Sequence, residues 1–413
     1  MTKHTEVLII GGGISGSTAA HFLRRPWQLL EREPVLGGLS TQYRSNDFWF
    51  DYGGHYFHFL HALPIQSHLT TSAPFKRYVR RSKVRIFDRL IPFPLQSHLE
   101  SLPATWRHRI VRELATPGAA PGNSLGSGLR ATFGSTLYQI FFYPFLSKYY
   151  DTDPDALASG MEKGSIPQPR PDTATLKRDK KPQGYNPEFF YPVGGLRLFW
   201  KKYEAPLMSS VRLSEPAISV DLTRRRVETR SNTYTFSRLI NTIPLPQFLS
   251  LLNGFPANPN PPGALIHAST RVTNMVLAVR RRRFHWVYLP ETIHPYYRMG
   301  YYPGAGACKI YLEQSVPLNT RMGEKESDAS HLLQQLGVIH DREEILYVSQ
   351  RTIPISYVLF NQSWFHTVPE ILQRLKEKGV YSIGRYGSWN YSSMAEDALT
   401  ARNTALAINR EMS

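Results

Sequence analysis

Residues 7–16 read VLIIGGGISG, an apolar run that breaks into glycines near the N-terminus. The spacing of Gly11, Gly13 and Gly16 fits G-x-G-x-x-G. In that pattern the three glycines permit, in turn, a tight turn, close approach of a pyrophosphate, and close packing of a helix on a strand. A helix that begins here offers free N–H groups and its positive dipole end to the anion. The stretch therefore predicts a strand, a glycine turn and a helix that form a pyrophosphate site.

An acidic residue and a second pair of glycines follow this stretch. Glu31 stands where a second strand should end, and we expect it to accept hydrogen bonds from ribose hydroxyls. Fourteen residues separate Gly16 from Glu31, fewer than the usual ~20, so the helix should be short and end by Pro26. Gly37-Gly38 and the D-x-G-G-H at 51–55 extend the pattern and favour FAD over NAD.

The glycine pattern resembles that of a FAD-dependent superfamily that includes amine oxidases, protoporphyrinogen oxidase and UDP-galactopyranose mutase. Separated blocks along nearly the whole chain are similar to the mutase family in particular. These blocks are IPFPLQ (91–96), FG (133–134), FYPFLSK (142–148), FYPVGG (190–195), NTIPL (241–245), WVYLPE (286–291), PYYR (295–298) and GRYGSWNY (384–391).

The resemblance implies an α/β fold, with a Rossmann-type FAD-binding domain, an inserted helical domain and an antiparallel β-sheet substrate domain. We expect the FAD-binding domain to be discontinuous, because its pieces are separated by the insertions. The expected domains are 1–64, 192–243 and 380–413 for FAD, 97–160 for the helical cap, and 75–96 with 265–370 for the substrate sheet.

Patterns outside the fingerprint predict individual elements. Residues 129–150 are aromatic with helical spacing, and 211–240 alternate as short strands. Residues 393–411 predict a terminal helix, whereas the Gly-, Pro- and Ser-rich stretch 116–128 predicts a loop. The proline- and lysine-rich stretch 167–187 predicts an exposed excursion.

FAD is the expected cofactor, held without a covalent tether. The residues expected to bind it are Gly11, Gly13, Ile14, Ser15, Gly16, Glu31, Arg32, Gly37, Gly38, Leu39, Ser40, His55, Val220, Gly384, Arg385 and Met394.

The resemblance also implies catalytic roles for His55, Arg298 and Tyr391. His55 matches a histidine beside the flavin, Arg298 an arginine that grips a diphosphate, and Tyr391 a tyrosine near the substrate phosphates. Each has a structural alternative: a core histidine, an arginine in a strand ion pair, and a buried tyrosine with a satisfied hydroxyl. The residues expected to bind substrate are Gln96, Lys163, Tyr297, Arg298 and Tyr391.

Three positions depart from the mutase pattern. Lys163 stands where the family has a second diphosphate arginine, Ile353 where a tyrosine precedes a proline, and Ser393 where Asp or Asn contacts follow the tyrosine. A lysine is a point charge and cannot replace the bidentate fork of an arginine. The flavin site therefore matches the family more closely than the substrate site does.

The implied function is pyranose–furanose ring contraction of a nucleotide-activated sugar through an adduct with N5 of the reduced flavin. The alternative enzyme is a FAD-dependent oxidoreductase (an oxidase, dehydrogenase or desaturase) in which hydride passes to the flavin. A flavin-holding scaffold without activity is the third reading. The altered substrate positions leave open another sugar nucleotide or another phosphorylated substrate.

Composition sets the remaining expectations. The chain has 413 residues, a formal net charge of +17 and one cysteine, Cys308, so a disulfide framework and a cysteine metal cluster are excluded. The surplus charge favours a phosphorylated or nucleotide-linked small molecule, and no nucleic-acid motif accompanies the short basic runs. Since no apolar run reaches the ~18 residues of a membrane span, we expect a cytoplasmic protein. We expect no metal, and a homodimer as the assembly.

Overall fold

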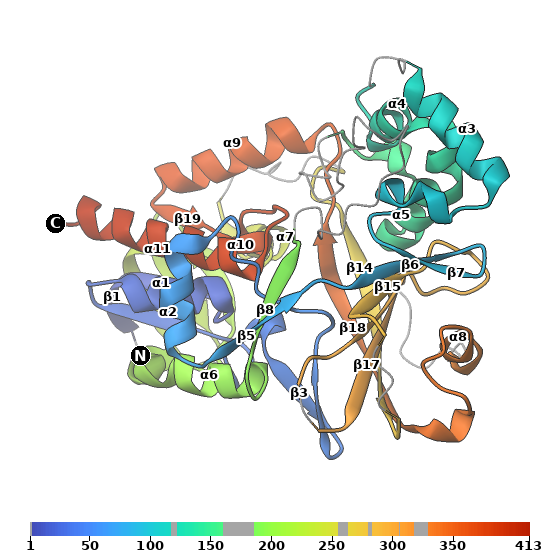
Figure 1. The fold of residues 1–413 in the computed structure, drawn as a ribbon. Coiled ribbons are helices and arrows are strands. Elements are labelled where there is room, and N and C mark those ends of the chain that lie inside the picture. Colours follow the sequence, from blue (N-terminus) through green and yellow to red (C-terminus); the bar gives the residue numbers. More distant parts are fainter. Residues whose placement is uncertain are drawn as a thin grey trace. The chain divides into compact units, whose positions relative to one another are not determined.

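The computed structural model describes residues 2–116, 122–159, 186–254, 263–279, 283–304, 306–317 and 329–413. The chain divides into two compact units, each assembled from separated segments (Figure 1). Unit 1 comprises Met1–Arg77, Phe190–Ile266 and Ser363–Ser413, and unit 2 comprises Tyr78–Phe189 and His267–Gln362. The chain passes between the units four times: within β5 (Phe75–Val79), within β8 (Glu188–Pro192), after Ile266 and after Gln362. The division into three domains expected from the sequence remains a prediction.

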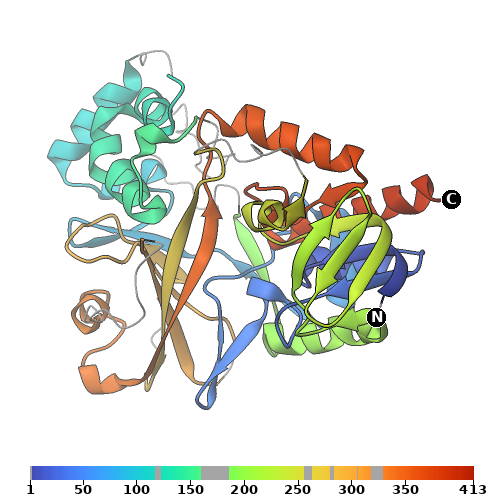
Figure 2. The same ribbon diagram turned by 180° about the vertical axis from the view of Figure 1, so that it is seen from behind.

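An eight-stranded sheet forms the centre of unit 1, in the order β13-β10-β11-β12-β1-β2-β9, with β19 paired to β12. Parallel pairing joins β12, β1, β2, β9 and β19, while β10, β11 and β12 form an antiparallel meander, seen as yellow-green arrows in Figure 2. The strands are β1 (Thr2–Ile10), β2 (Trp27–Leu30), β9 (Val211–Arg212), β10 (Ala217–Asp221), β11 (Arg226–Thr229), β12 (Thr233–Asn241), β13 (Leu252–Asn253) and β19 (Val380–Ser382).

The apolar run of the fingerprint explains why β1 lies inside this sheet. Val7, Leu8 and Ile9 are fully buried, and β1 is paired in parallel on both sides, with β12 and with β2. A parallel strand covered on both faces requires a continuous apolar sequence rather than an alternating one. Helix α1 (Ile14–Phe22) returns along β1 and packs against α11 (Met394–Glu411).

The remaining elements of unit 1 are helices and the hairpin of β3 with β4. They are η1 (Gly38–Ser40), β3 (Gln42–Ser45), β4 (Phe48–Asp51), α2 (Leu63–Thr71), α6 (Leu196–Glu204), η6 (Ala205–Ser210), α7 (Leu245–Ser250), α9 (Trp364–Glu377) and α10 (Gly384–Gly387).

Unit 2 contains a seven-stranded sheet in the order β18-β14-β17-β16-β15-β6-β7, antiparallel except between β15 and β6. Its strands are β6 (Ser82–Ile86), β7 (Arg89–Pro92), β14 (His267–Leu277), β15 (Trp286–Tyr288), β16 (Arg298–Tyr301), β17 (Cys308–Ser315) and β18 (Ile345–Val358). Its helices are η2 (Leu95–Ser97), η3 (Leu99–Ser101), α3 (Ala104–Ala115), α4 (Leu125–Leu137), η4 (Tyr138–Phe142), α5 (Tyr143–Tyr150), η5 (Pro154–Ala156), α8 (Ser330–Gln335) and η7 (Arg342–Glu344).

A hydrophobic cluster packs the sheet of unit 2 against α8. Met299, Ile310 and Leu312 from the strands meet Leu332 and Leu333 of the helix, and all are buried. Strand β14, which lies between β18 and β17, is buried along its length from Ala268 onward, on both of its faces. Both faces carry buried polar as well as apolar side chains, for example Asn274 beside Val272 on one face and Thr273 beside Met275 on the other.

The structure confirms the predicted α/β class, with its Rossmann-like part and antiparallel strands. The loop predicted for 116–128 is wrong at its end, because Ser124 caps α4 and the helix begins at Leu125. Ser124 and Ser127 form a reciprocal capping box, which satisfies free N–H groups of the first turn despite the glycines there. Residues 117–121 and 160–185, which include Lys163 and most of 167–187, lie outside the described residues.

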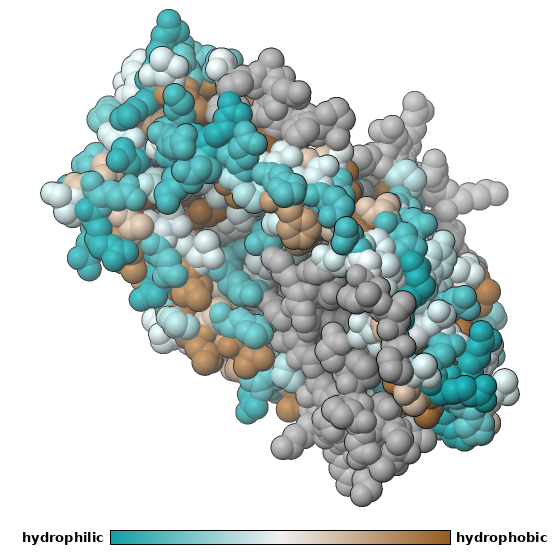
Figure 3. All heavy atoms as spheres, turned by 90° about the horizontal axis from the view of Figure 1, so that it is seen from above, coloured by the Kyte–Doolittle hydropathy of each residue, from teal (hydrophilic) through white to brown (hydrophobic). Residues whose placement is uncertain are grey.

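Hydrophilic side chains cover most of the coloured surface in Figure 3, and hydrophobic ones occur there in small groups. Among the described helices, none combines the length and apolarity needed to cross a bilayer.

Candidate functional site

The glycine turn after β1 has the geometry that the fingerprint requires. Gly11 has a φ of +97°, which favours glycine. A Cβ at Gly16 would lie 1.9 Å from the carbonyl oxygen of Gly11, so α1 can begin this close to the strand only without a side chain. A Cβ at Gly13 would meet nothing within 4 Å. The backbone at Gly13 therefore faces open space at the N-terminus of α1, where an anion is favoured.

The second glycine pair docks directly on this turn. The Gly37 N–H donates a hydrogen bond of 2.9 Å to the Gly12 carbonyl, and Gly37 forms an isolated parallel bridge with Gly13. Gly37 has a φ of +115° and Gly38 a φ of +52°. A Cβ on Gly38 would lie 3.5 Å from the Gly13 Cα. Two glycine motifs that are separated in sequence thus form one cradle of backbone, in which Gly13 is partly exposed and Gly38 exposed.

Glu31 joins the cradle through its carboxylate. Its Oε2 accepts from the Gly12 N–H at 2.6 Å, and its Oε1 accepts from the Glu33 N–H at 2.8 Å. Burial raises the pKa of Glu31, and these two N–H groups counteract part of the rise. Each carboxylate oxygen retains a further acceptor site. Glu31 therefore organises the turn, and its contact with a ribose remains a prediction.

The segment 384–391, which precedes the last helix, packs against the start of α1. A Cβ at Gly384, whose φ is +77°, would lie 2.2 Å from the Ser15 Oγ, so the chain passes over the helix start only as glycine. Nearby, the Thr242 hydroxyl donates to the carbonyls of Ile10 and Gly11. Segments at both ends of the sequence thus meet at the same turn of unit 1.

Arg385 shapes the loop before the last helix. Its Nε and Nη2 donate to the Ser392 carbonyl at 2.9 and 2.6 Å, and its guanidinium stacks on the Tyr391 ring with 4.6 Å to the centroid. Arginine can make both contacts at once because its planar fork is also a stacking surface. Arg385 therefore holds the position of Tyr391 in unit 1.

The N-terminus of α11 is capped by Ser393. Its Oγ accepts from the Glu396 N–H, and the Glu396 carboxylate accepts from the Ser393 N–H at 2.8 Å. One turn inside, the buried carboxylate of Asp397 accepts from the Ser392 hydroxyl at 2.5 Å. Burial raises the pKa of Asp397 to about 6. Ser393, which departs from the mutase pattern, has a local structural role as a helix cap.

His55 follows β4 in a tight turn. Its backbone N–H donates to the Gly53 carbonyl, and Gly53 has a φ of +118°. Asp51 ends β4 and is buried, where its carboxylate accepts from the Tyr191 hydroxyl and from the Gln42 side chain. These bonds anchor the base of the turn that carries His55. The role of His55 beside a flavin remains a prediction.

The other expected cofactor residues also lie in unit 1, in different environments. Ile14, Ser15 and Ser40 are buried near the cradle, and Leu39 is partly buried in η1. Arg32 is exposed and paired with Glu33. Val220 is fully buried in β10 and donates its N–H to Leu251, and Met394 is the first residue of α11.

In unit 2, Arg298 forms a bidentate ion pair with Glu313 across β16 and β17. Nε lies 2.6 Å from Oε2 and Nη2 lies 2.8 Å from Oε1. The Glu313 side chain is 4% exposed and that of Arg298 17%, so the pair is nearly desolvated. Burial alone would lower the pKa of Arg298, but the Glu313 carboxylate holds it above its ordinary value. The guanidinium is thus committed to an internal partner.

The other expected substrate residues described in unit 2 are buried. Tyr297 is fully buried, and its hydroxyl lies 3.2 Å from the Thr270 Oγ1. Gln96 is 1% exposed in η2, and Ile353 lies buried in β18. Burial raises the pKa of Tyr297 well above its ordinary value. Contacts of Gln96 and Tyr297 with a substrate remain predictions.

Sequence reasoning missed the partners that hold these residues. Glu313 is 15 positions from Arg298 and meets it only through the pairing of β16 with β17. Gly12 and Thr242 lie within the glycine run and the NTIPL block, but the sequence does not indicate that Gly12 bonds Glu31 or that Thr242 bonds the Gly11 carbonyl. The available signal for Glu313 in the sequence is a possible cross-strand pairing of the PYYR segment (295–298) with the KIYLEQ segment (309–314), which contains this acidic residue.

Comparison with known proteins agrees with this geometry. A family model described as an NAD(P)-binding Rossmann-like domain matches residues 9–67, which span the cradle. A reduced UDP-galactopyranose mutase superposes with a TM-score of 0.84 at 21% identity, covering 98% of this chain and 96% of its own. The chain has the fold of UDP-galactopyranose mutase. The predicted resemblance is confirmed at the level of the fold.

Other solved structures share this mutase-like fold. A wild-type putrescine oxidase bound to putrescine has a TM-score of 0.67 at 14% identity, with 99% of each chain covered. A CLA-producing fatty acid isomerase from P. acnes has a TM-score of 0.62 at 13% identity, with 98% of each chain covered. The named activities of these proteins differ, so the fold alone does not select a reaction.

We predict that substitution of Gly13 abolishes cofactor binding without destabilising the fold, whereas substitution of Gly16 destabilises the fold. Gly13→Val should leave the melting temperature of the cofactor-free protein within a few degrees of wild type, because its φ of −69° is ordinary and the added Cβ meets nothing within 4 Å. It should abolish dinucleotide binding, because the side chain occupies the anion's place. Gly16→Ala should instead destabilise the fold by at least ~1–3 kcal/mol, a typical cost of overpacking.

Calorimetric melting of both variants, with and without added FAD, checks this pair. A Gly13→Val protein that still gains stability from FAD would contradict the assignment of the open space to the pyrophosphate.

A second prediction concerns pH. The native state holds a proton on Asp397 with a pKa of about 6, above the ordinary 3.8, so it binds that proton more tightly than the unfolded chain does. The associated stability is present below pH 4 and is lost as the pH rises to about 6. Asp397→Asn removes this titration and retains an acceptor for Ser392.

Urea unfolding at pH 4 and pH 6.5 should show wild type losing about 2–3 kcal/mol relative to Asp397→Asn over this interval. The exposed Asp47→Asn serves as the matched control, since its side chain is 79% exposed. Parallel profiles of wild type and Asp397→Asn would disprove the buried titration.

Proposed function

We propose that the protein is a FAD-dependent enzyme that catalyses ring contraction of a nucleotide-activated sugar. The observation that carries the proposal is the cradle of unit 1, in which Gly13 faces open space at a helix N-terminus. The likeness of the fold to UDP-galactopyranose mutase, which covers 98% of this chain, supports a sugar nucleotide as the substrate class. The predicted FAD agrees with a dinucleotide-binding family model over residues 9–67.

The residues of the cradle fit a dinucleotide. The α1 N-terminus and the amides around Gly13 would bind the pyrophosphate, and Glu31 would accept from the adenosine ribose. When bound, FAD would supply a ring that in its reduced form is a nucleophile and in its oxidised form accepts hydride. Arg385 and the capped start of α11 would hold the loop that carries Tyr391.

His55 and Tyr391 are proposed to act near the ring system. His55 stands on a turn that is anchored by the buried Asp51, so its position is fixed by the fold of unit 1. It would donate a hydrogen bond to the reduced cofactor and favour the anionic form. Tyr391 would donate its hydroxyl to a substrate phosphate, with its ring held by Arg385.

A FAD-dependent oxidoreductase is the second candidate, and the Arg298–Glu313 pair favours it. An arginine whose Nε and Nη2 both bond a buried carboxylate has less capacity left for a diphosphate. Lys163 is a point charge where a second fork is expected. A substrate without a diphosphate would not need either group.

A single-turnover assay separates the two candidates. The FAD-loaded protein is reduced anaerobically with dithionite and mixed with UDP-galactopyranose, and the products are separated by chromatography. The proposal requires UDP-galactofuranose, with the flavin still reduced at the end and none formed by the oxidised protein. Substrate-dependent bleaching of oxidised flavin, without ring contraction of any UDP-hexose, would establish the oxidoreductase instead.

We predict that a role of Arg298 in binding the diphosphate can be separated from its role in stabilising the fold. Arg298→Ala leaves Glu313 buried and unpaired, so it should destabilise unit 2 by about 3–5 kcal/mol. Arg298→Met combined with Glu313→Leu should regain most of that loss, because a buried pair can often be replaced by apolar groups. If Arg298 grips the diphosphate, calorimetry should show UDP binding at least about tenfold weaker in the double variant.

The matched control is Arg130→Ala, which breaks a bidentate pair with Asp155 on partly exposed side chains in the same unit. It should cost about 1 kcal/mol or less and leave UDP binding unchanged. Wild-type UDP affinity in the stable double variant would assign Arg298 to the fold alone.

A further inference from the structure

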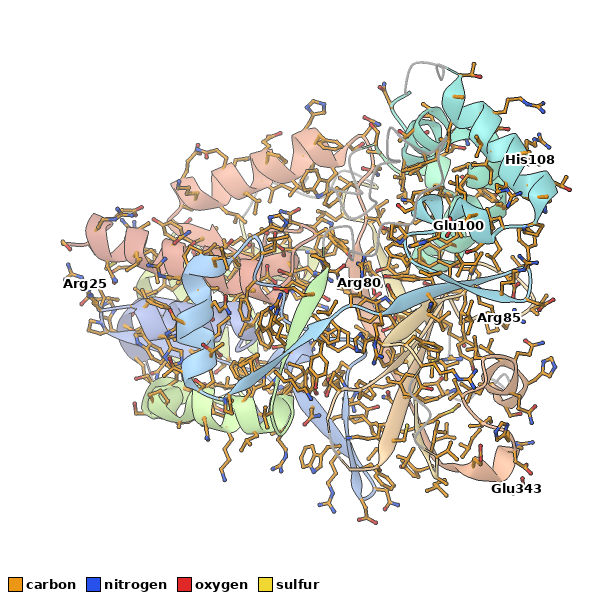
Figure 4. All side chains as sticks on the ribbon, viewed as in Figure 1. Arg25, Arg80, Arg85, Glu100, His108 and Glu343 are labelled. Atoms are coloured by element: carbon orange, nitrogen blue, oxygen red, sulfur yellow. The ribbon has the colours of Figure 1, made fainter. Side chains whose placement is uncertain are left out.

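We propose that unit 1 carries a second ligand site, for the phosphate group of a small phosphorylated molecule, at the C-terminal ends of α1 and α11. A hollow of about 500 Å³ lies there, lined by Arg24, Arg25, Leu406, Asn409, Arg410 and Ser413. This volume is within the range of small-molecule sites. Figure 4 shows Arg25 at the end of unit 1 where α11 ends.

The floor of the hollow is preorganised by Asn409. Its side-chain NH₂ donates to the Phe22 carbonyl at 2.9 Å, and its Oδ1 accepts from the Arg24 N–H at 2.9 Å. Asn409 is 9% exposed, so both bonds are shielded from water. They join the last turn of α11 to the end of α1. The two helix ends therefore form one rigid wall.

The charge of the lining is positive. Arg24, Arg25 and Arg410 contribute three guanidinium groups, and no acidic side chain is among the lining residues. Glu411, the neighbouring acid, accepts a hydrogen bond from Tyr381 and lies 3.8 Å from Arg238. Each helix C-terminus carries only about half a negative charge. In this chain, Ser413 adds the negative charge of its α-carboxylate. Three full positive charges exceed this carboxylate and the two helix ends together, and the surplus favours an anion.

Geometry further restricts the ligand. Arg25 Nη2 donates to the Met412 carbonyl, which holds that guanidinium at the hollow, while Arg24 and Arg410 are exposed and can close on a guest. Guanidinium groups bind phosphate oxygens in a bidentate manner. Leu406 supplies an apolar surface for the organic part of a phosphate ester.

The hollow is distinct from the cofactor cradle. The cradle lies at the N-terminus of α1 and the hollow beyond its C-terminus, at the other end of nine helical residues. At 1.5 Å per residue, the helix separates the two by about 13 Å. A molecule in the hollow therefore does not occupy the dinucleotide cradle.

The test uses the full chain saturated with FAD and three probes in calorimetry: adenosine 5′-monophosphate, adenosine and inorganic phosphate. The proposal expects the monophosphate to bind more tightly than phosphate, and adenosine not to bind. Arg24→Gln combined with Arg410→Gln should weaken the monophosphate by about tenfold or more, since charge-assisted hydrogen bonds are lost. Both arginines are exposed, so the melting temperature should be retained.

Lys201→Gln combined with Lys202→Gln removes the same charge from the exposed face of α6 in the same unit. This control should change the affinity less than twofold. Equal weakening in both double variants would assign the binding to general positive charge and overturn the site. The site would also be overturned if wild type did not bind the monophosphate, or if it bound it no more tightly than phosphate. The same conclusion would follow if Arg24→Gln combined with Arg410→Gln left the affinity for the monophosphate unchanged.

Discussion

The structure of unit 1 depends on the absence of a side chain at Gly16. The carbonyl oxygen of Gly11 occupies the place where a Cβ would stand, 1.9 Å away. Because of that contact, only three residues separate the end of β1 from the start of α1, whose first N–H groups lie beside the turn. Glu31, Gly37 and Gly384 then pack around the turn, each through a bond or a contact that a displaced helix could not offer. The close start of the helix at Gly16 is thus one steric constraint on which the cradle depends.

Much of this unit could be predicted from the sequence, because its signals are local. The apolar run at 7–10, the glycine spacing and the acid at 31 each follow from short-range geometry. Pro26 agrees with a helix that stops at Phe22, and Glu31 follows directly after β2. The resemblance added the distant pieces, such as Gly384, which the structure places against Ser15.

Features that depend on pairing across a sheet could not be predicted in the same way. From the sequence, Arg298 is either a cation for a diphosphate or an arginine in a strand ion pair, and only the register of β16 with β17 identifies Glu313 as its partner. β14 is buried on both faces with polar groups such as Asn274 inside, and the partners of such groups depend on the pairing of β14 with its neighbouring strands. The prediction of a loop up to Gly128 was wrong because Ser124 caps a helix that begins at Leu125, and the Gly-, Pro- and Ser-rich composition of the stretch gives no sign of this role.

The cradle does not determine which reaction is catalysed, because a mutase, an oxidase and a fatty acid isomerase share this fold. Everything proposed for the reaction requires that the cradle hold FAD. The most direct measurement is the absorption spectrum of the purified protein, with chromatography of the cofactor released on denaturation. We predict a yellow protein that releases FAD in an amount equimolar to the chain. A colourless protein that also takes up no added FAD would contradict the account.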